Sequence, residues 1–192
     1  MLIVICHHVG RLVDRCLESL QKLHLGNIQV RVVVVTSTTE VFPNVITFQH
    51  TGGPAEKRNV ACWVYGEGCQ YFLFVDDDAE LSPYAVWAAV QEMRSRPRCG
   101  MGFAKILNME RRNIFDDCGS WLTWTGFLWA RAGNETRDQG QYDEPCRVLA
   151  SKSATCVVSR EAFQSAGGFD RDYFILGEET DLAWRIWLLG WE

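Results

Sequence analysis

The chain has 192 residues, of which 47% are hydrophobic and 22% charged, as is usual for one soluble globular domain with a hydrophobic core. Its formal net charge of −5 argues against a general nucleic-acid binder, because neutralising backbone phosphates requires a basic face. The eight cysteines show no CxxC motif or short paired spacing, so we expect free thiols in a reducing cytoplasm rather than a zinc site.

The first part of the sequence has the pattern of a β-α-β unit. Residues 2–6, LIVIC, form a continuous apolar run that begins without the basic segment of a signal peptide. Residues 13–20 carry apolar side chains at helical spacing, and residues 30–35, VRVVVV, are mostly β-branched. A weaker strand is expected at residues 45–48. Continuous rather than alternating apolar strands indicate a parallel sheet that is covered on both faces.

Two further helices are predicted on either side of the apolar strand at residues 71–75. The first follows a glycine turn, has Pro54 at its first position, and is expected to bury Val60, Trp63 and Val64. The second is expected to be capped by Ser82, to start at residue 83 and to end before residue 97. Its predicted buried stripe is Val86, Ala89, Val90 and Met93.

Three consecutive acids, Asp76, Asp77 and Asp78, follow the strand at residues 71–75 directly. Like charges this close raise one another's pKa and cost stability unless something offsets them. One interpretation is a solvated loop that helps to cap the next helix, an effect worth about 0.3 to 1 kcal/mol. However, three carboxylates exceed what capping requires. They end a strand where open α/β sheets bind ligands, and one or two carboxylates with substrate phosphates are what Mg²⁺ prefers.

The second half of the sequence has a looser pattern. Residues 100–151 predict irregular α+β structure, followed by a strand at 155–159, a short helix at 160–166 and a last helix at about 180–189. Among the aromatic residues of this half, Trp121, Trp124 and Trp129 could stack on a sugar or meet an acceptor lipid. Burial is the commoner fate of tryptophan, so we expect them to be packed inside.

Four stretches, in this order, resemble the GT-A, family 2 glycosyltransferases. They are GGPAEKRNVA (52–61), FLFVDDDAELSP (72–83), SREAFQSAGGFDRDYF (159–174) and LGEETDLAWRIWLLGW (176–191). The likeness is greatest to the bacterial branch of rhamnosyltransferase-like enzymes, which build surface polysaccharides of the cell envelope. It implies an α/β fold of the GT-A type, with three α/β/α layers around a mostly parallel, mixed central sheet.

The resemblance covers essentially the whole chain and implies one GT-A domain, 1–192. Residues 1–99 would form the nucleotide-sugar-binding half and residues 100–192 the acceptor and catalytic half. Because family members usually continue past the last of these helices, we expect the protein to extend beyond Glu192. No segment is long enough for the roughly 20 residues that span a bilayer. We therefore expect a cytoplasmic protein, with peripheral association at the inner face of the cell membrane left open.

The resemblance also implies the chemistry. Family members transfer a sugar from a nucleoside diphosphate to a glycan or lipid-linked acceptor, with inversion at the anomeric carbon and Mg²⁺ or Mn²⁺ bound at the D-x-D. By motif, Asp76 would contact the ribose or sugar and share the metal with Asp78, while Asp77 is the middle residue. Arg58 would lie near the diphosphate or base, where its donor fork suits phosphate oxygens. The alternative for Arg58 is an ordinary surface position on its helix.

An inverting transfer needs a carboxylate to take the proton of the acceptor hydroxyl. The family's usual base, the second acid of its Glu-Asp pair, corresponds to Glu179, so this chain has Glu where Asp is customary. The extra methylene leaves Asp181 as a second candidate base, with Glu178 orienting its neighbours. The competing interpretation of all three is an acidic helix start favoured by the helix dipole.

The chain departs from the family pattern at two strand ends. Cys6-His7-His8 stands where Thr-Tyr-Asn is usual, and Thr36-Ser37 replaces an Asp that contacts the nucleobase. Cys6 and Thr36 are therefore candidate donor contacts, and Trp121 is a candidate acceptor contact, while the base stays open. A metal site at the histidine pair is disfavoured, because adjacent strand residues point to opposite faces.

Two rival functions remain at this stage. A sugar-phosphate nucleotidyltransferase would need a Gly-rich loop bearing Arg or Lys directly after the first strand, and CHHVGRL does not supply one convincingly. A degenerate sugar-binding relative is favoured by the missing nucleobase Asp and by Glu at position 179.

Overall fold

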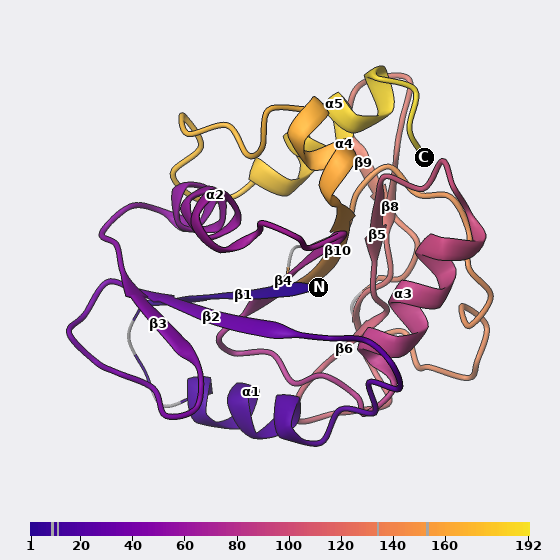
Figure 1. Cartoon of the computed structure of the whole chain (residues 1–192). Helices are drawn as coiled ribbons and strands as arrows, with labels where there is room; N and C mark the ends of the chain where they lie inside the picture. The colour runs from indigo at the N-terminus through magenta and orange to yellow at the C-terminus, as the bar shows by residue number, and fades with distance from the viewer. Residues whose placement is uncertain (9, 11, 134, 153) are drawn as a thin grey trace.

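The apolar runs of the sequence form a six-stranded sheet in the order β3-β2-β1-β4-β10-β5 (Figure 1). The computed structural model describes all residues except 9, 11, 134 and 153. The strands of this sheet are β1 (Leu2–His7), β2 (Arg31–Thr36), β3 (Ile46–Gln49), β4 (Tyr71–Asp76), β5 (Met101–Phe103) and β10 (Thr155–Ser159). The first four are parallel, and β10 is antiparallel to both of its neighbours, so the predicted mixed, mostly parallel sheet is confirmed.

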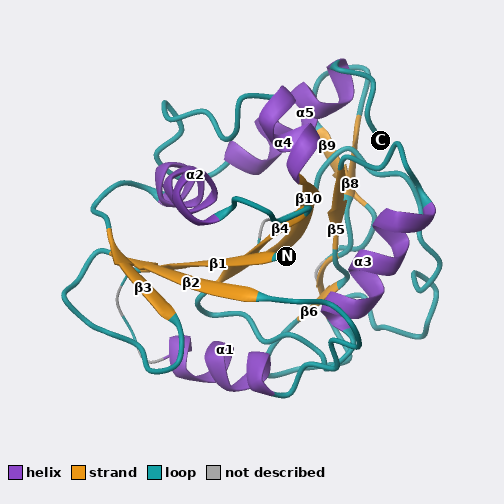
Figure 2. Cartoon of the chain, viewed as in Figure 1, coloured by secondary structure: helices purple, strands orange, loops and turns teal. Residues whose placement is uncertain are grey.

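Helices cover both faces of the sheet, which confirms the three-layer arrangement (Figure 2). On one face lie α1 (Leu12–Gln21) and α3 (Ala85–Ser95), and on the other lie α2 (Pro54–Tyr65), α4 (Arg160–Ser165) and α5 (Glu178–Leu188). Alternate strand residues enter the two cores, so that Leu2 and Val4 pack on the α2 side while Ile3 and Ile5 pack on the α1 side. Both faces of β1 are thus apolar, as its continuous run indicates.

The helix α2 has a different buried face from the one predicted. Trp63 and Val64 are 50% and 55% exposed and Val60 is only half-buried, so the predicted stripe is wrong. The buried residues of α2 include three polar ones, Lys57, Arg58 and Asn59. Partners on other elements decide this orientation: the Asn59 amide, for example, donates to the carbonyl of Phe169 at 2.7 Å and accepts from its N–H at 2.8 Å.

The start of α3 also differs from the prediction. The helix begins at Ala85, whose N–H donates to the backbone carbonyl of Ser82, and no side chain caps it. Leu81 is buried and its N–H donates to the Ser19 hydroxyl, which fixes the chain against α1 and moves the helix start two residues on. Of the predicted stripe, Val86, Val90 and Met93 are buried and Ala89 is half-buried.

The second half contains two small sheets, consistent with the irregular structure expected there. One pairs β6 (Ile106–Leu107) with β7 (Phe115–Asp117), and the other pairs β8 (Ser120–Leu122) with β9 (Leu128–Ala130). We call residues 120–130 the aromatic hairpin. The predicted burial of its tryptophans is wrong, because Trp124 and Trp129 are 98% and 67% exposed and Trp121 is exposed as well. The small core at the base of this region is built instead from Phe115, Cys118 and Ala132.

All eight cysteines are free thiols, and Cys16 and Cys62 are buried among apolar side chains, as expected. The last helix, α5, starts at Glu178, two residues before the predicted position, so it includes both acids of the Glu-Glu pair. In the described part of the chain, no helix combines the length and apolar character needed to cross a membrane.

Candidate functional site

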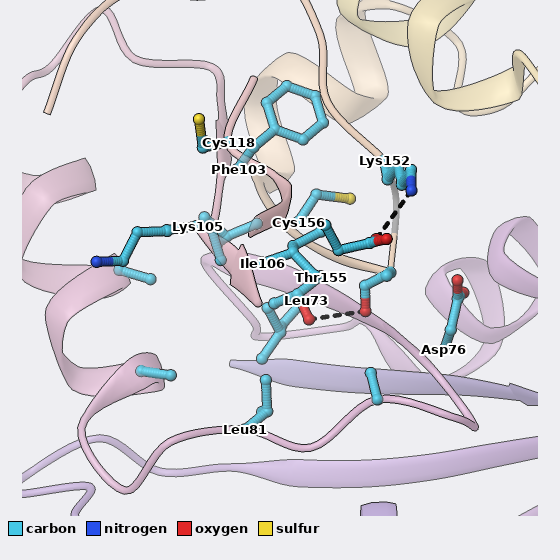
Figure 3. A pocket seen from close by; sticks show the side chains of 18 of the residues that line it. Leu73, Asp76, Leu81, Phe103, Lys105, Ile106, Cys118, Lys152, Thr155 and Cys156 are labelled. Atoms are coloured by element: carbon cyan, nitrogen blue, oxygen red, sulfur yellow. Dashed lines mark hydrogen bonds and ion pairs between the residues drawn. The ribbon is translucent and has the colours of Figure 1, made fainter. Parts of the chain in front are cut away.

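The parallel register brings the carboxyl ends of β1, β2 and β4 together. Cys6 on β1 lies opposite Asp76 on β4, and His7 lies opposite Thr36 on β2. A cavity of about 1470 Å³ opens at this edge. Figure 3 shows Asp76 at one end of a pocket whose wall includes Leu73, Phe103 and Ile106. The predicted site residues that line the cavity are Cys6, Arg58, Asp76, Asp77, Asp78, Glu178 and Glu179.

Arg58 lies between two of these acids. Its Nη1 donates to Glu178 Oε1 at 2.8 Å and its Nη2 to Asp76 Oδ1 at 2.9 Å. The guanidinium carbon is 5.3 Å from the centre of the Phe169 ring and 5.8 Å from that of Phe74. Arg58 is only 2% exposed, so the alternative of an ordinary surface arginine is wrong. The geometry assigns it to hold two carboxylates, while contact with a diphosphate stays a prediction.

The three aspartates of the acidic tip have different surroundings. Asp77 Oδ2 lies 2.8 Å from Nδ1 of the buried His7 and accepts from the His8 N–H at 3.4 Å, so it ties the end of β4 to the end of β1. Burial raises the pKa of Asp76, and the Arg58 guanidinium offsets part of the rise. Asp78 is exposed in the turn that follows β4.

Asp76 and Asp78 fit a divalent ion that shares its coordination with a ligand. Among the described residues, no group of three or more His, Cys, Asp or Glu side chains is placed to hold a metal ion by itself. Mg²⁺ and similar hard cations are often held by one or two carboxylates together with substrate phosphates. The carboxylate oxygens of Asp76 and Asp78, at the mouth of a cavity, are a donor set of that kind.

The two candidate bases on α5 differ in their contacts. Asp181 Oδ2 accepts from Arg185 Nε at 2.9 Å and from its Nη2 at 2.6 Å, and Asp181 is not among the described residues that line the cavity. Glu179 does line the cavity. Burial raises its pKa to about 7, and the negative charge of the adjacent Glu178 adds to the rise. Glu179 therefore differs from Asp181 in lining the cavity and in having a raised pKa.

The remaining predicted contacts are placed less favourably. Thr36 is fully buried, and its hydroxyl is 3.0 Å from that of Thr38 and accepts from the Thr38 N–H. Trp121 donates its indole N–H to the Arg147 carbonyl at 3.0 Å, outside the described lining of the cavity. Cys6 does face the cavity, and burial raises the pKa of its thiol to about 11, so the thiol is neutral.

Comparison with known proteins identifies the fold. No family model and no curated protein matches the chain. Among solved structures, residues 1–349 of S. aureus TarS match with a TM-score of 0.63 at 17% identity, covering 98% of this chain. The mannosyltransferase PcManGT from Pyrobaculum calidifontis, solved with GDP-Man and Mn²⁺, matches with a TM-score of 0.64 at 15% identity over 100% of this chain. This chain has the GT-A glycosyltransferase fold.

TarS 1–349 was also solved in complex with UDP-GlcNAc, and that structure matches with a TM-score of 0.63 at 16% identity over 98% of this chain. The chain spans only 53 to 56% of the length of these three structures. At such identities the likeness establishes the GT-A fold, and the residues of the site must support any function.

Two lysines near the strand ends of the GT-A fold escaped the sequence analysis. Lys57 is buried, and its ammonium group donates to the His7 carbonyl at 2.8 Å and to the Ser37 hydroxyl at 2.7 Å. Burial lowers the pKa of Lys57. It stands one position before Arg58 in the same motif, but its apparent place on a helix surface gave no sign of burial.

The second lysine, Lys152, lines the cavity and is shown in Figure 3 together with Asp76. Its backbone N–H donates to the buried Asp117 at 2.7 Å, and its ammonium group is 2.9 Å from Asp116 Oδ2. Two residues further on, the Ala154 carbonyl accepts from the Asp76 N–H at 3.1 Å. The loosely patterned segment around Lys152 contains no motif that could have singled it out.

The buried position of Arg58 leads to a stability prediction. Replacing it, in Arg58→Met, leaves Asp76 and Glu178 without their counter-charge, so the free energy of unfolding should fall by about 3 to 5 kcal/mol at pH 8. The loss should shrink as the pH is lowered to 5, because burial already raises the pKa of Asp76, and without the Arg58 charge its carboxyl takes up a proton more readily in the folded state. Urea denaturation at both pH values measures this.

The matched control is Arg112→Met, which removes an exposed arginine paired with Glu80. Exposed ion pairs contribute little, so this change should cost less than about 1 kcal/mol. Equal losses in the two variants would contradict the role of Arg58.

Proposed function

We propose that this protein is an inverting, metal-dependent glycosyltransferase that moves a sugar from a nucleoside diphosphate to a glycan or lipid-linked acceptor. The observation that carries the proposal is one cavity, at the strand ends of a GT-A fold, that contains both the D-x-D acids and a carboxylate with a pKa of about 7. The GDP-Man and Mn²⁺ in the PcManGT complex and the UDP-GlcNAc in the TarS complex support a donor of this class.

Residues 1–99 would supply most of the donor end of the site. Asp76 and Asp78 would hold Mg²⁺ or Mn²⁺, which when bound supplies Lewis-acid charge for the departing diphosphate. Asp77 holds the turn after β4 in place through its contact with His7. The uncharged thiol of Cys6 forms part of the cavity wall. The terminal nitrogens of Arg58 contact Asp76 and Glu178, so we infer that it acts on the donor by fixing Asp76.

Lys152 is the cationic side chain that we assign to the donor diphosphate. Lys57 is buried against His7 and Ser37, and Arg58 is buried against two acids, whereas the ammonium group of Lys152 is on an exposed side chain of the cavity wall. Its loop is fixed by Asp117, which also accepts from the Ser151 hydroxyl at 3.0 Å. The hydrogen bond between Ala154 and Asp76 places this loop beside the D-x-D tip.

Glu179 would act as the general base. Its carboxylate takes the proton from the acceptor hydroxyl while that oxygen forms its bond to the anomeric carbon. The bond from this carbon to the diphosphate oxygen breaks on the opposite face, so the configuration inverts. Arg58 donates a hydrogen bond to Glu178, and the charge of Glu178 adds to the burial that raises the pKa of Glu179 to about 7.

The donor end is tested by calorimetric titration of UDP, GDP and dTDP with and without Mn²⁺. Because the acids of the tip repel a diphosphate, nucleotide affinity should fall at least tenfold, about 1.4 kcal/mol, when EDTA replaces Mn²⁺. Asp78→Asn should lose most of the metal-dependent part. Asp143→Asn, which changes another acid of the cavity wall, should not. Equal affinity with Mn²⁺ and with EDTA would rule out the metal site.

The same titrations examine Lys152. Lys152→Met should weaken the binding of nucleoside diphosphates and leave nucleosides unaffected, since only the diphosphate carries the charge that the ammonium group would contact. Lys105→Met is the control, because Lys105 also lines the cavity but contacts Asp138 and Asp143. An equal loss of affinity for the nucleoside and for the nucleoside diphosphate would show that Lys152 does not contact the diphosphate.

The base is tested by turnover. Glu179→Gln keeps the size of the side chain but removes its basicity, so kcat should fall roughly 10²- to 10⁴-fold while donor affinity holds. In the unchanged protein kcat should rise with pH through about 7, because Glu179 must be deprotonated to act. Asp181→Asn, the control, should lose much less. Product formation from several nucleotide-sugars with Mn²⁺ gives the measurement.

Near-normal turnover in both Glu179→Gln and Asp181→Asn would show that the general base is not on α5. Donor binding without turnover in the unchanged protein, with any donor and acceptor, would instead favour the degenerate sugar-binding relative.

A further inference from the structure

The aromatic hairpin, residues 120–130, presents a large apolar surface to solvent. Its eleven residues, SWLTWTGFLWA, include no charged side chain. The two strands place Trp121 opposite Trp129 and Leu122 opposite Leu128. Six large apolar side chains are exposed on it: Trp121, Leu122, Trp124, Phe127, Leu128 and Trp129. Contiguous exposed apolar surface of this kind marks an interaction site.

The polar groups at the tip of the aromatic hairpin bond largely to one another. The Thr123 N–H donates to the Phe127 carbonyl at 2.7 Å, and the Gly126 N–H donates to the Thr123 carbonyl at 2.9 Å. The Thr123 hydroxyl accepts from the Phe127 N–H at 3.0 Å and lies 2.9 Å from the Thr125 hydroxyl. A backbone turn with internal partners is suited to a medium without water, where unpaired polar groups cost several kcal/mol.

These contacts favour a lipid surface over a soluble glycan. A site for a sugar needs polar groups that are free to fix the orientation of its hydroxyls. Here the hydroxyls of Thr123 and Thr125 bond within the turn, and the Trp121 indole N–H donates to the Arg147 carbonyl. Tryptophan is also the side chain that lies best at the boundary between headgroups and hydrocarbon.

Arginines border the base of the aromatic hairpin. Arg147, whose carbonyl accepts from Trp121, places its Nη2 2.7 Å from Glu192 Oε1, and Arg98 Nε is 3.8 Å from the same oxygen. Both arginines are exposed. These three side chains, two guanidinium groups and one carboxylate, sum to one positive charge, and Arg147 joins them to the uncharged aromatic hairpin. This charge is complementary to anionic headgroups.

The base of the aromatic hairpin lies at the cavity. Cys118 precedes β8 and Arg131 follows β9, and both line the cavity that holds the D-x-D acids. The Arg131 N–H donates to the Gly119 carbonyl at 2.8 Å, and its Nη1 donates to that of Cys118 at 3.3 Å. Any surface to which the tip of the aromatic hairpin binds therefore lies close to the wall of the cavity.

We propose that the aromatic hairpin docks this protein on an anionic bilayer by inserting Trp124 and Phe127 into the headgroup region. At about 3.3 Å per residue, the four steps from Ser120 to Trp124 extend at most roughly 13 Å, enough for a tip to enter the 5 to 10 Å that interfacial segments occupy. Docking does not depend on the transfer reaction. Where the proposed function holds, it brings the cavity to a lipid-linked acceptor.

The experiment is co-sedimentation of the protein with vesicles of phosphatidylcholine alone and of phosphatidylcholine mixed with phosphatidylglycerol. The protein should bind the mixed vesicles more tightly. The double change Trp124→Ser with Phe127→Ser should lower that affinity at least tenfold. Trp63→Ser, which alters a half-exposed tryptophan on α2, should bind as the unchanged protein does. Circular dichroism shows that each variant is folded.

Two further variants distinguish the contribution of aromatic insertion to vesicle binding from that of the arginine charges. Arg98→Gln with Arg147→Gln should remove the preference for phosphatidylglycerol and leave binding to neutral vesicles. Trp124→Phe should still bind but should lose part of the fluorescence quenching produced by brominated lipids.

Three outcomes would overturn the proposal. One is no binding to either vesicle, and another is equal binding by the double hairpin variant. The third is a dimer in sedimentation velocity that dissociates on changing Trp124 and Phe127, with no vesicle binding, which would make the occupant a second copy of this chain.

Discussion

The guanidinium of Arg58 is the contact on which the geometry of the site depends. It is supplied by α2, and it holds Asp76 at the end of β4 and Glu178 at the start of α5, residues that are 18 and 120 positions away in the sequence. Taking a charge out of water is costly unless it is paired, so Arg58 and Glu178 are buried together, with the half-buried Asp76 as a second partner of the guanidinium. The rings of Phe74 and Phe169 lie against the guanidinium. One side chain therefore contacts both the proposed donor end, at Asp76, and the residue next to the proposed base, Glu178.

This ion triplet also sets the electrostatics of the proposed base. Burial of Glu179 raises its pKa to about 7, and the charge of the neighbouring Glu178, which Arg58 contacts, adds to the rise. A carboxyl whose pKa is higher in the folded state than in the unfolded chain binds more protons when folded. Its contribution to stability is therefore present at low pH and is lost as the pH rises from about 4.5 to about 7. The site is less stable at the pH at which Glu179 can accept a proton.

Much of the fold could be predicted from local pattern, because the strands are continuous apolar runs and the acids of the tip follow one of them directly. The burial of Lys57, Arg58 and Asn59 could not, because their partners lie on distant elements and the apolar spacing of α2 points to another face. The difference between Glu179 and Asp181 could not be predicted either, because it depends on the hydrogen bonds that Arg185 donates to Asp181. The prediction that Trp124 is buried is also wrong. It rests on the usual burial of tryptophan, but burial requires a partner surface that no sequence pattern reveals.

The most direct test of this account is a carbon-13 NMR titration of the glutamate carboxyl groups, with Glu179 assigned by its loss in Glu179→Gln. The account predicts that Glu179 titrates at about 7 in the unchanged protein. In Glu178→Gln its pKa should be lower, but still above the ordinary value of 4.5, because burial is the larger cause of the rise. A Glu179 carboxyl that titrates near 4.5 in the unchanged protein would contradict the account.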